Sequence, residues 1–207
     1  MVLDKNPELT IDDDLIKIQI EFEQKNPNII LCSKPFHKIE FLNRLINSVK
    51  DSIIIVDMDL LYTGYVQSGM IKKKENVIIF CPDKIDWKEK ISKIISNVSK
   101  ERFLVIIDSF NGVYNLFDEL ESARFINSCI MLLSSIGNQT KSSVIVTGMA
   151  RKNDNDEWVL SPGGKHIIKS EKTGVYFLKK SLNDLVIVTL EKVGTDSRKF
   201  VIKQENV

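Results

Sequence analysis

The sequence predicts an α/β protein in which a mostly parallel sheet is covered by helices on both faces. Residues 52–57 and 143–147 form almost continuously apolar runs, whereas a strand with one exposed face alternates apolar and polar residues. Stretches with apolar residues at helical spacing separate these runs. Such alternation of strands and helices is typical of a parallel sheet with helical crossovers.

Two regions are expected along the 207 residues. Residues 1–27 form a leader and a helix, with Leu15, Ile18 and Phe22 at helical spacing, and residues 28–207 form one core domain. The core is expected to contain, in order, a strand at 28–32, a helix at about 37–49, strands at 52–57 and 76–81, a helix at about 84–99, a strand at 102–108, a helix at about 118–137 and a strand at 142–148.

The pattern changes after residue 150. Residues 151–160 are predicted to form a polar loop. Two apolar runs, 175–178 and 185–190, are joined by a short polar turn and predict an antiparallel hairpin added to the parallel sheet. Residues 199–202 would supply one more edge strand.

Composition restricts the function classes. The 29 basic and 28 acidic residues nearly cancel, so no global attraction to nucleic acid is expected. The cysteines Cys32, Cys81 and Cys129 lie far apart in apolar stretches, which favours reduced thiols over disulfides or a metal site. No apolar run approaches the ~20 residues that span a bilayer. We expect a cytoplasmic protein without a membrane partner.

The first strand is followed by a segment that stands where a phosphate-binding loop would be. Such a loop reads G-x-x-x-x-G-K-[ST], and its glycines let backbone N–H groups converge on phosphates. Here Cys32 and His37 replace the glycines, Lys38 keeps the lysine position, and Ile39 replaces the hydroxyl residue. Residues 28–50 contain no glycine. We therefore expect that this segment does not bind ATP in the usual way, although Lys38 could still attract an anion.

Carboxylates end two of the predicted strands. Asp108, followed by Ser109, ends a strongly apolar strand and would either organise magnesium or cap the following turn. Asp57 and Asp59 would lie at the same sheet edge, where they either polarise a water molecule or belong to a solvated turn. The candidate ATP or magnesium ligands are thus Lys38, Asp108 and Ser109, with Asp108 and Asp59 as vestigial catalytic residues.

The polar stretch 151–160 is the candidate contact for single-stranded DNA. Arg151, Lys152 and Lys165 would contact phosphates, and Trp158 would stack on bases. The alternative is that Trp158 anchors the loop to the core.

Four segments together resemble the RecA/RadA recombinase superfamily, especially archaeal RadA/RadB-like paralogues and KaiC-like ATPases. Residues 55–59 look like the family's I-D-T-E element, residues 105–109 match the Walker B strand, residues 144–148 resemble the strand before the second DNA-binding loop, and residues 162–164 match the P-x-G-G segment that closes it. The resemblance covers about residues 28–203. It implies a RecA-like P-loop NTPase core with a C-terminal antiparallel hairpin.

Several departures from the family pattern are substitutions at the positions that bind or hydrolyse ATP in the family. The Walker A segment keeps only Lys38, Asp59 is one methylene shorter than the catalytic glutamate, and residues 192–194 lack the arginine of the K-x-R pair. The resemblance with these losses implies a relaxed demand for ATP hydrolysis.

The implied function is that of a non-hydrolysing regulatory or accessory subunit in DNA recombination or repair. Its partner would be a RecA/RadA-like protein or further copies of itself, with single-stranded DNA as a second candidate ligand. No cofactor is expected, although ATP with magnesium stays open. Two alternatives remain: an atypical active ATPase that uses Lys38, Asp108 and Asp59, and an RNA-binding ring subunit like the RecA-fold subunits of Elongator.

Overall fold

The structure, a computed structural model, describes residues 13–115, 119–156, 158–160, 170–182, 184–190 and 198–203. The elements in chain order are α1 (Asp13–Gln24), β1 (Asn28–Cys32), α2 (Pro35–Ser48), β2 (Ser52–Asp57), α3 (Leu61–Gln67), β3 (Val77–Phe80), α4 (Trp87–Val98), β4 (Phe103–Asp108), the 3₁₀ helix η1 (Phe110–Asn115), α5 (Glu119–Thr140), β5 (Ser143–Lys152), β6 (Trp158–Leu160), β7 (Gly174–Ser181), β8 (Asp184–Thr189) and β9 (Lys199–Ile202).

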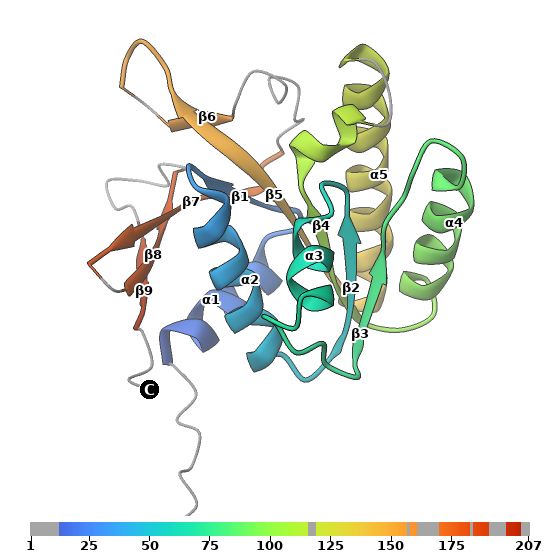
Figure 1. The fold of residues 1–207 in the computed structure, drawn as a ribbon, viewed down its shortest axis with the longest axis horizontal. Helices are drawn as coiled ribbons and strands as arrows, with labels where there is room; N and C mark the ends of the chain where they lie inside the picture. Colours follow the sequence, from blue (N-terminus) through green and yellow to red (C-terminus); the bar gives the residue numbers. More distant parts are fainter. Residues whose placement is uncertain are drawn as a thin grey trace, which may run out of the picture.

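One sheet of nine strands organises the described part of the chain. Its order is β3-β2-β4-β5-β1-β7-β8-β9, with β6 paired to β5. The strands from β3 to β7 run parallel, whereas β8, β9 and β6 pair antiparallel with their neighbours. The predicted fold class, a mostly parallel α/β sheet with helices and a C-terminal antiparallel hairpin, is confirmed (Figure 1).

Helices cover both faces of the sheet, as the apolar strands require. On one face, α1, α2 and α3 pack on side chains such as Ile30, Ile55 and Leu178. On the other face, α4, α5 and η1 pack on Val56, Val105 and others. Among the described helices, none combines the length and the apolar character that crossing a membrane requires.

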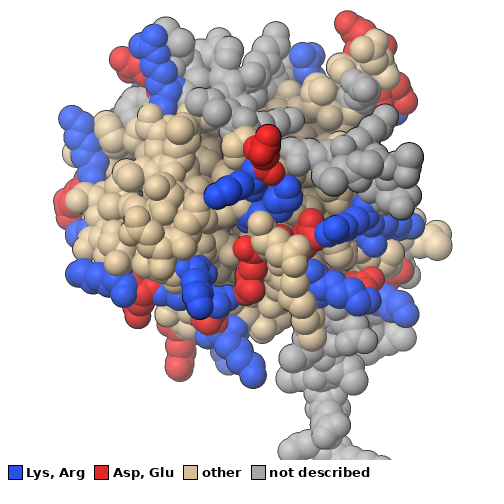
Figure 2. Space-filling model, turned by 180° about the vertical axis from the view of Figure 1, so that it is seen from behind, with Lys and Arg blue, Asp and Glu red and all other residues tan. Residues whose placement is uncertain are grey.

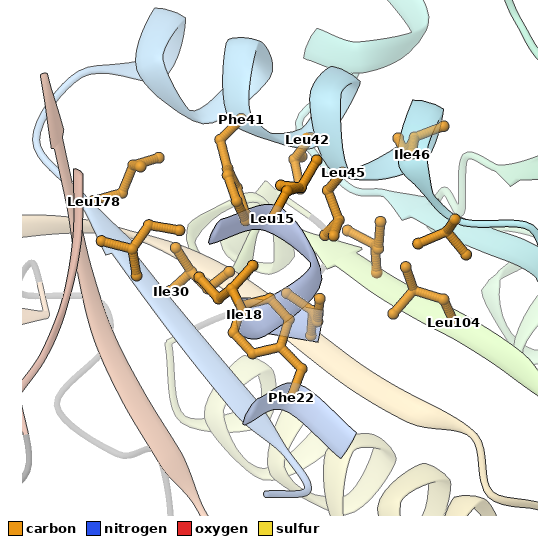
Figure 3. Close-up of a cluster of buried hydrophobic side chains, with 14 of the residues drawn as sticks. Leu15, Ile18, Phe22, Ile30, Phe41, Leu42, Leu45, Ile46, Leu104 and Leu178 are labelled. Atoms are coloured by element: carbon orange, nitrogen blue, oxygen red, sulfur yellow. The ribbon is translucent and has the colours of Figure 1, made fainter. Parts of the chain in front are cut away.

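The N-terminal helix α1 belongs to the first of these layers. Its Leu15, Ile18 and Phe22 join the cluster that α2 forms with the sheet (Figure 3). Asn28 fixes the end of the helix, because its side-chain amide donates to the carbonyl oxygens of Phe22 at 2.8 Å and Lys25 at 2.7 Å. These bonds satisfy carbonyls that the last helical turn leaves without partners.

Two local predictions are wrong. Helix α3 was not predicted. Residues 151–160 do not form a loop, because β5 continues to Lys152 and pairs with β6 across a turn at 153–156. In Figure 1, β5 runs well beyond its neighbours toward β6. A Cβ atom at Gly148 would lie 2.5 Å from a terminal methyl group of Leu160, so the Leu160 side chain packs directly over this glycine and would have to shift for a larger residue.

Candidate functional site

The candidate site lies at the carboxyl ends of four adjacent parallel strands, β2, β4, β5 and β1. In open α/β sheets this edge is where ligands bind, because the loops that leave the strands converge there. The strands place Asp57 beside Asp108 in register, and α2 follows directly from β1. The predicted residues Lys38, Asp59, Asp108 and Ser109 are thus brought together in space.

Lys38 points into the protein from the first turn of α2. Only Ser33 and Lys34 separate β1 from this helix, and the Lys38 backbone N–H donates to the carbonyl oxygen of Lys34 at 3.4 Å as the helix begins. The Lys38 side chain is 2% exposed, and its Nζ lies 2.6 Å from Asp108 Oδ1 and 3.0 Å from Asp59 Oδ2. The ammonium group therefore has two carboxylate partners within the chain.

Two hydroxyl groups complete the contacts of these carboxylates. Ser109 Oγ donates to Asp59 Oδ2 at 2.9 Å, and Thr147 Oγ1 donates to Asp108 Oδ1 at 2.5 Å. Ser109 and Thr147 are buried. Because hydrogen bonds to ionised groups are stronger than neutral ones, they hold both carboxylates in place around Lys38.

The backbone around Asp59 is fixed as well. The Met58 N–H donates to the Asp108 carbonyl oxygen at 2.5 Å, which ties the turn after β2 to the end of β4. A Cβ atom at Gly112 would lie 2.7 Å from the Met58 carbonyl carbon. Glycine at this position lets η1 approach the turn that carries Asp59.

Asp57 is the third carboxylate of the group. It is fully buried, so its interpretation as part of a solvated turn is wrong. Its Oδ2 accepts the Thr63 N–H at 2.7 Å, whereas its Oδ1 has no hydrogen-bond partner among the described residues. Oxygens of Asp57, Asp59 and Asp108 lie within 4.8 Å of one another.

At each of these groups, burial and the neighbouring opposite charge shift the pKa in opposite directions. Burial raises the pKa of Asp108 to about 6, although Lys38 opposes that shift. Burial alone would lower the pKa of Lys38, but the carboxylates of Asp108 and Asp59 outweigh it and raise that pKa. For Asp59, burial raises the pKa, but the Lys38 ammonium outweighs this effect and the net shift is downward. At neutral pH the cluster is therefore an ionised network with Lys38 as its cation.

Sequence reasoning left out the contribution of α3. The N–H groups of Thr63 and Leu61 reach Asp57 and Asp59, and the buried Tyr62 hydroxyl lies without a hydrogen-bond partner among the described residues. The segment is a short helix containing Gly64 and the β-branched Thr63 and Val66. Its low helix propensity hides it from pattern analysis.

The fold type implies a nucleotide with magnesium, and the residues at this edge do not fit the phosphates of that group. A phosphate loop offers converging N–H groups from glycines, whereas here helix α2 begins two residues after β1 and contains no glycine. A phosphate that used Lys38 would have to replace both carboxylates in its contacts. We therefore derive no catalytic step through ATP.

The proposed nucleic-acid residues lie elsewhere. Arg151 and Lys152 belong to β5 and Trp158 belongs to β6; Lys165 and the segment 162–164 lie outside the described residues, as does 192–194. The Trp158 ring stacks on Phe177, with centroids 4.1 Å apart and an interplanar angle of 18°. Trp158 thus anchors the β5–β6 hairpin to the sheet, which is the alternative considered for it.

Comparison with known proteins establishes the fold. No family model matches the chain, and no curated protein sequence matches it. Among solved structures, one ATPase domain superposes with a TM-score of 0.56 and 11% identity, covering 96% of this chain and all of that one. A DnaB-like replicative helicase gives 0.53 and 10%, covering 96% of this chain and 65% of the helicase. The RadB recombinase gives 0.53 and 14%, covering 87% and 93% of the two chains.

These similarities identify the chain's architecture as that of RecA-fold ATPase domains. At 10–14% identity they describe the fold and not the chemistry.

Proposed function

We propose that this protein is a RecA-fold subunit that does not hydrolyse ATP and that acts as a regulatory or accessory component in DNA recombination or repair. The observation that carries the proposal is the ion cluster around Lys38. The residue that would contact phosphates is buried and bound to Asp108 and Asp59. A buried ion pair is costly to break, because each charge left without a partner keeps its desolvation penalty.

The surroundings of Lys38 support the same proposal. The helix start at Pro35 removes the loop in which N–H groups would surround phosphates, and proline itself contributes no N–H. A subunit without nucleotide chemistry acts through its surfaces, and the resemblance to recombinase paralogues favours a RecA/RadA-like protein or another copy of the chain as its partner. The stacking of Trp158 on Phe177 argues against base stacking by this residue.

An atypical ATPase is the second candidate function. It is favoured by two buried oxygens, Asp57 Oδ1 and Asp108 Oδ2, that have no hydrogen-bond partner among the described residues. With Asp59 they form a group of carboxylates of the kind that binds hard cations.

Calorimetric titration of Mg-ATP, with a parallel hydrolysis assay, separates the two functions. The proposal predicts no binding heat at millimolar nucleotide and no turnover, with or without single-stranded DNA. Micromolar binding that is lost in both Lys38→Ala and Asp108→Ala would contradict it and favour the ATPase.

Matched controls exist on helix α4 and at the residue that precedes it. Lys93 and Asp86 are surface residues with ion-pair partners of their own, so Lys93→Ala and Asp86→Ala remove the same charges away from the site. Binding that persists in these controls while it disappears in the site variants would assign it to the cluster.

A further inference from the structure

Leu182 lies at the tip of the hairpin between β7 and β8. β7 ends at Ser181, which pairs with Asp184 at the start of β8, so the turn between the strands is tight. The Leu182 side chain is 96% exposed, and its φ of 56° lies in the left-handed region that such turns usually fill with asparagine or glycine. A single exposed leucine is common on a protein surface, but a leucine held in this conformation is not. Neither packing nor turn geometry within the chain accounts for this residue.

Ile85 provides a comparison at the same edge of the sheet. It follows β3 and is 94% exposed. Its backbone N–H donates to Asp83 Oδ1 at 2.7 Å, an ordinary turn contact, and it is not among the described residues with a positive φ. Exposure alone therefore does not distinguish Leu182 from Ile85. The difference is that Leu182 combines exposure with an unfavourable backbone conformation.

Strand β7 carries Leu182 beyond the carboxyl edge of the parallel sheet. Cys32, the last residue of β1, pairs with Leu178, whereas β7 continues to Ser181. At the rise of a strand this extension is about 10 Å. In Figure 1 the β7–β8 hairpin lies at the left margin of the molecule. The Leu182 side chain is thus presented to a neighbouring molecule.

An apolar cavity lies at the opposite edge of the same sheet. It is the cavity of about 290 Å³ beneath α1, and its lining includes the first residues of β4 and β5, two strands that run parallel to β1 and β7. Apolar cavities of about 150 Å³ already hold a benzene ring, so a leucine side chain fits this one. Ile16 also lines the cavity and is 39% exposed, so the cavity reaches the surface. The buried part of the lining is apolar and consists of Phe22, Leu45, Val49, Phe103 and Leu104.

Shape rather than charge matches the hairpin tip to this cavity. Residues 181–183 at the tip carry no charge. Two basic and two acidic residues border the cavity, namely Lys50, Arg102, Glu23 and Asp51. Figure 2 shows that basic and acidic side chains are also intermixed over the described part of the rear face, without a wide area of one sign. A neutral apolar tip therefore meets a rim without net charge.

We propose that Leu182 of one copy inserts into the cavity beneath α1 of a second copy, so that chains associate head to tail. Because the tip and the cavity lie at opposite edges of one sheet, the contact joins different surfaces, and each added copy leaves one tip and one cavity free. The contact goes beyond the proposed function and is independent of whether the chain binds ATP. A contact centred on one side chain falls at the small end of specific interfaces, so association in the high micromolar range is expected.

Sedimentation velocity of the full chain, up to millimolar concentration, tests the contact. The average mass of the native chain should rise beyond that of a dimer, because a head-to-tail contact does not stop at two copies. Leu182→Gly should weaken association by about tenfold or more, because it removes the inserted side chain. This variant should keep its fold, since glycine suits a positive φ. Ile85→Gly is the matched control and should leave association unchanged.

Two variants together test the direction of the contact. Ile16→Glu places a carboxylate at the mouth of the cavity but leaves Leu182 intact, so this variant alone should stay monomeric. Leu182→Gly has the opposite defect, with an intact cavity. A mixture of the two variants retains one complete contact for each pair of chains. It should therefore form dimers and nothing larger.

Three results would each overturn the proposal. They are a native chain that stays monomeric, an Ile85→Gly variant that loses association as Leu182→Gly does, and a mixture that stays monomeric although circular dichroism shows both variants folded. A monomeric native chain would leave a RecA/RadA-like protein as the partner in the proposed function. Mg-ATP titration remains a separate readout, so the two proposals fail independently.

Discussion

The strand pair β2–β4 has an ion cluster at each end, and in each cluster one cation contacts two carboxylates. At the carboxyl end Lys38 contacts Asp108 and Asp59. At the amino end Arg102 contacts Glu23 at 2.5 Å and Asp51 at 2.9 Å. The same charges thus occur in two environments within one fold.

Burial distinguishes the two clusters. Lys38 and Asp108 are 2% and 0% exposed and Asp59 is 27% exposed, whereas the side chains at the amino end are between 42% and 52% exposed. The exposed cluster also borders a cavity of about 290 Å³ beneath α1. Water and salt screen exposed charges, whereas a buried charge depends on its partner. We infer that the Lys38 cluster is structurally important and that the Arg102 cluster contributes little to stability.

The largest expected effect is that of removing the buried cation. Lys38→Met leaves Asp108 and Asp59 without their shared counter-ion, so we expect a loss of about 3–5 kcal/mol in the free energy of unfolding. Urea denaturation followed by circular dichroism measures it. The control is Lys93→Met on the surface of α4, which should change stability by no more than about 0.5 kcal/mol. Equal effects of the two substitutions would refute the structural role of Lys38.

The second prediction concerns pH. The folded pKa of Asp108 is about 6, above its ordinary value of 3.8, so between these values the folded chain holds a proton that the unfolded chain releases. Acidification from pH 7.5 to 5 should therefore stabilise the native chain relative to Asp108→Asn, by on the order of 1–2 kcal/mol.

Unfolding curves at several pH values in both proteins measure this difference. The surface variant Asp86→Asn should follow the native curve between pH 7.5 and 5, because the hydrogen bond from Lys90 lowers the pKa of Asp86 and keeps it ionised throughout this range. A difference between native and Asp108→Asn that stays constant with pH would show that Asp108 does not titrate in this window.

The smallest effect is expected at the exposed cluster. Arg102→Met should cost less than about 1 kcal/mol, and the cost should shrink in ~0.5 M salt, because exposed ion pairs are weak and screened. Urea denaturation at low and high salt gives both values. A loss in the free energy of unfolding as large as that of Lys38→Met would show that burial does not distinguish the contributions of the two clusters.

Much of the sheet could be predicted because its strands carry their own signal. The runs at 28–32 and 52–57 coincide with β1 and β2. An apolar stretch of this length between polar turns is typical of a buried strand. The β5–β6 hairpin was missed because β5 extends beyond the covered part of the sheet. There Arg151 and Lys152 lie in strand while exposed to water, and polarity alone suggested a loop.

The residues of the candidate site could be predicted from the sequence, but the ion pairs that they form could not. Lys38, Asp59, Asp108 and Ser109 fall at strand ends or helix starts, so a parallel sheet brings them to one edge. Their pairing depends on where α2 begins. Helix and loop readings of residues 33–37 differ by only a few residues, and helix boundaries are the least certain part of a sequence prediction.

The most direct test of the account is a double-mutant cycle between Lys38 and Asp108, measured with and without Mg-ATP. The free energies of unfolding of the native chain, Lys38→Met, Asp108→Asn and the double variant give the coupling of the two side chains. The account predicts a coupling of about 2–3 kcal/mol that millimolar Mg-ATP leaves unchanged. A coupling near zero would contradict the account, and stabilisation of the native chain by Mg-ATP that Lys38→Met abolishes would show that Lys38 contacts phosphate.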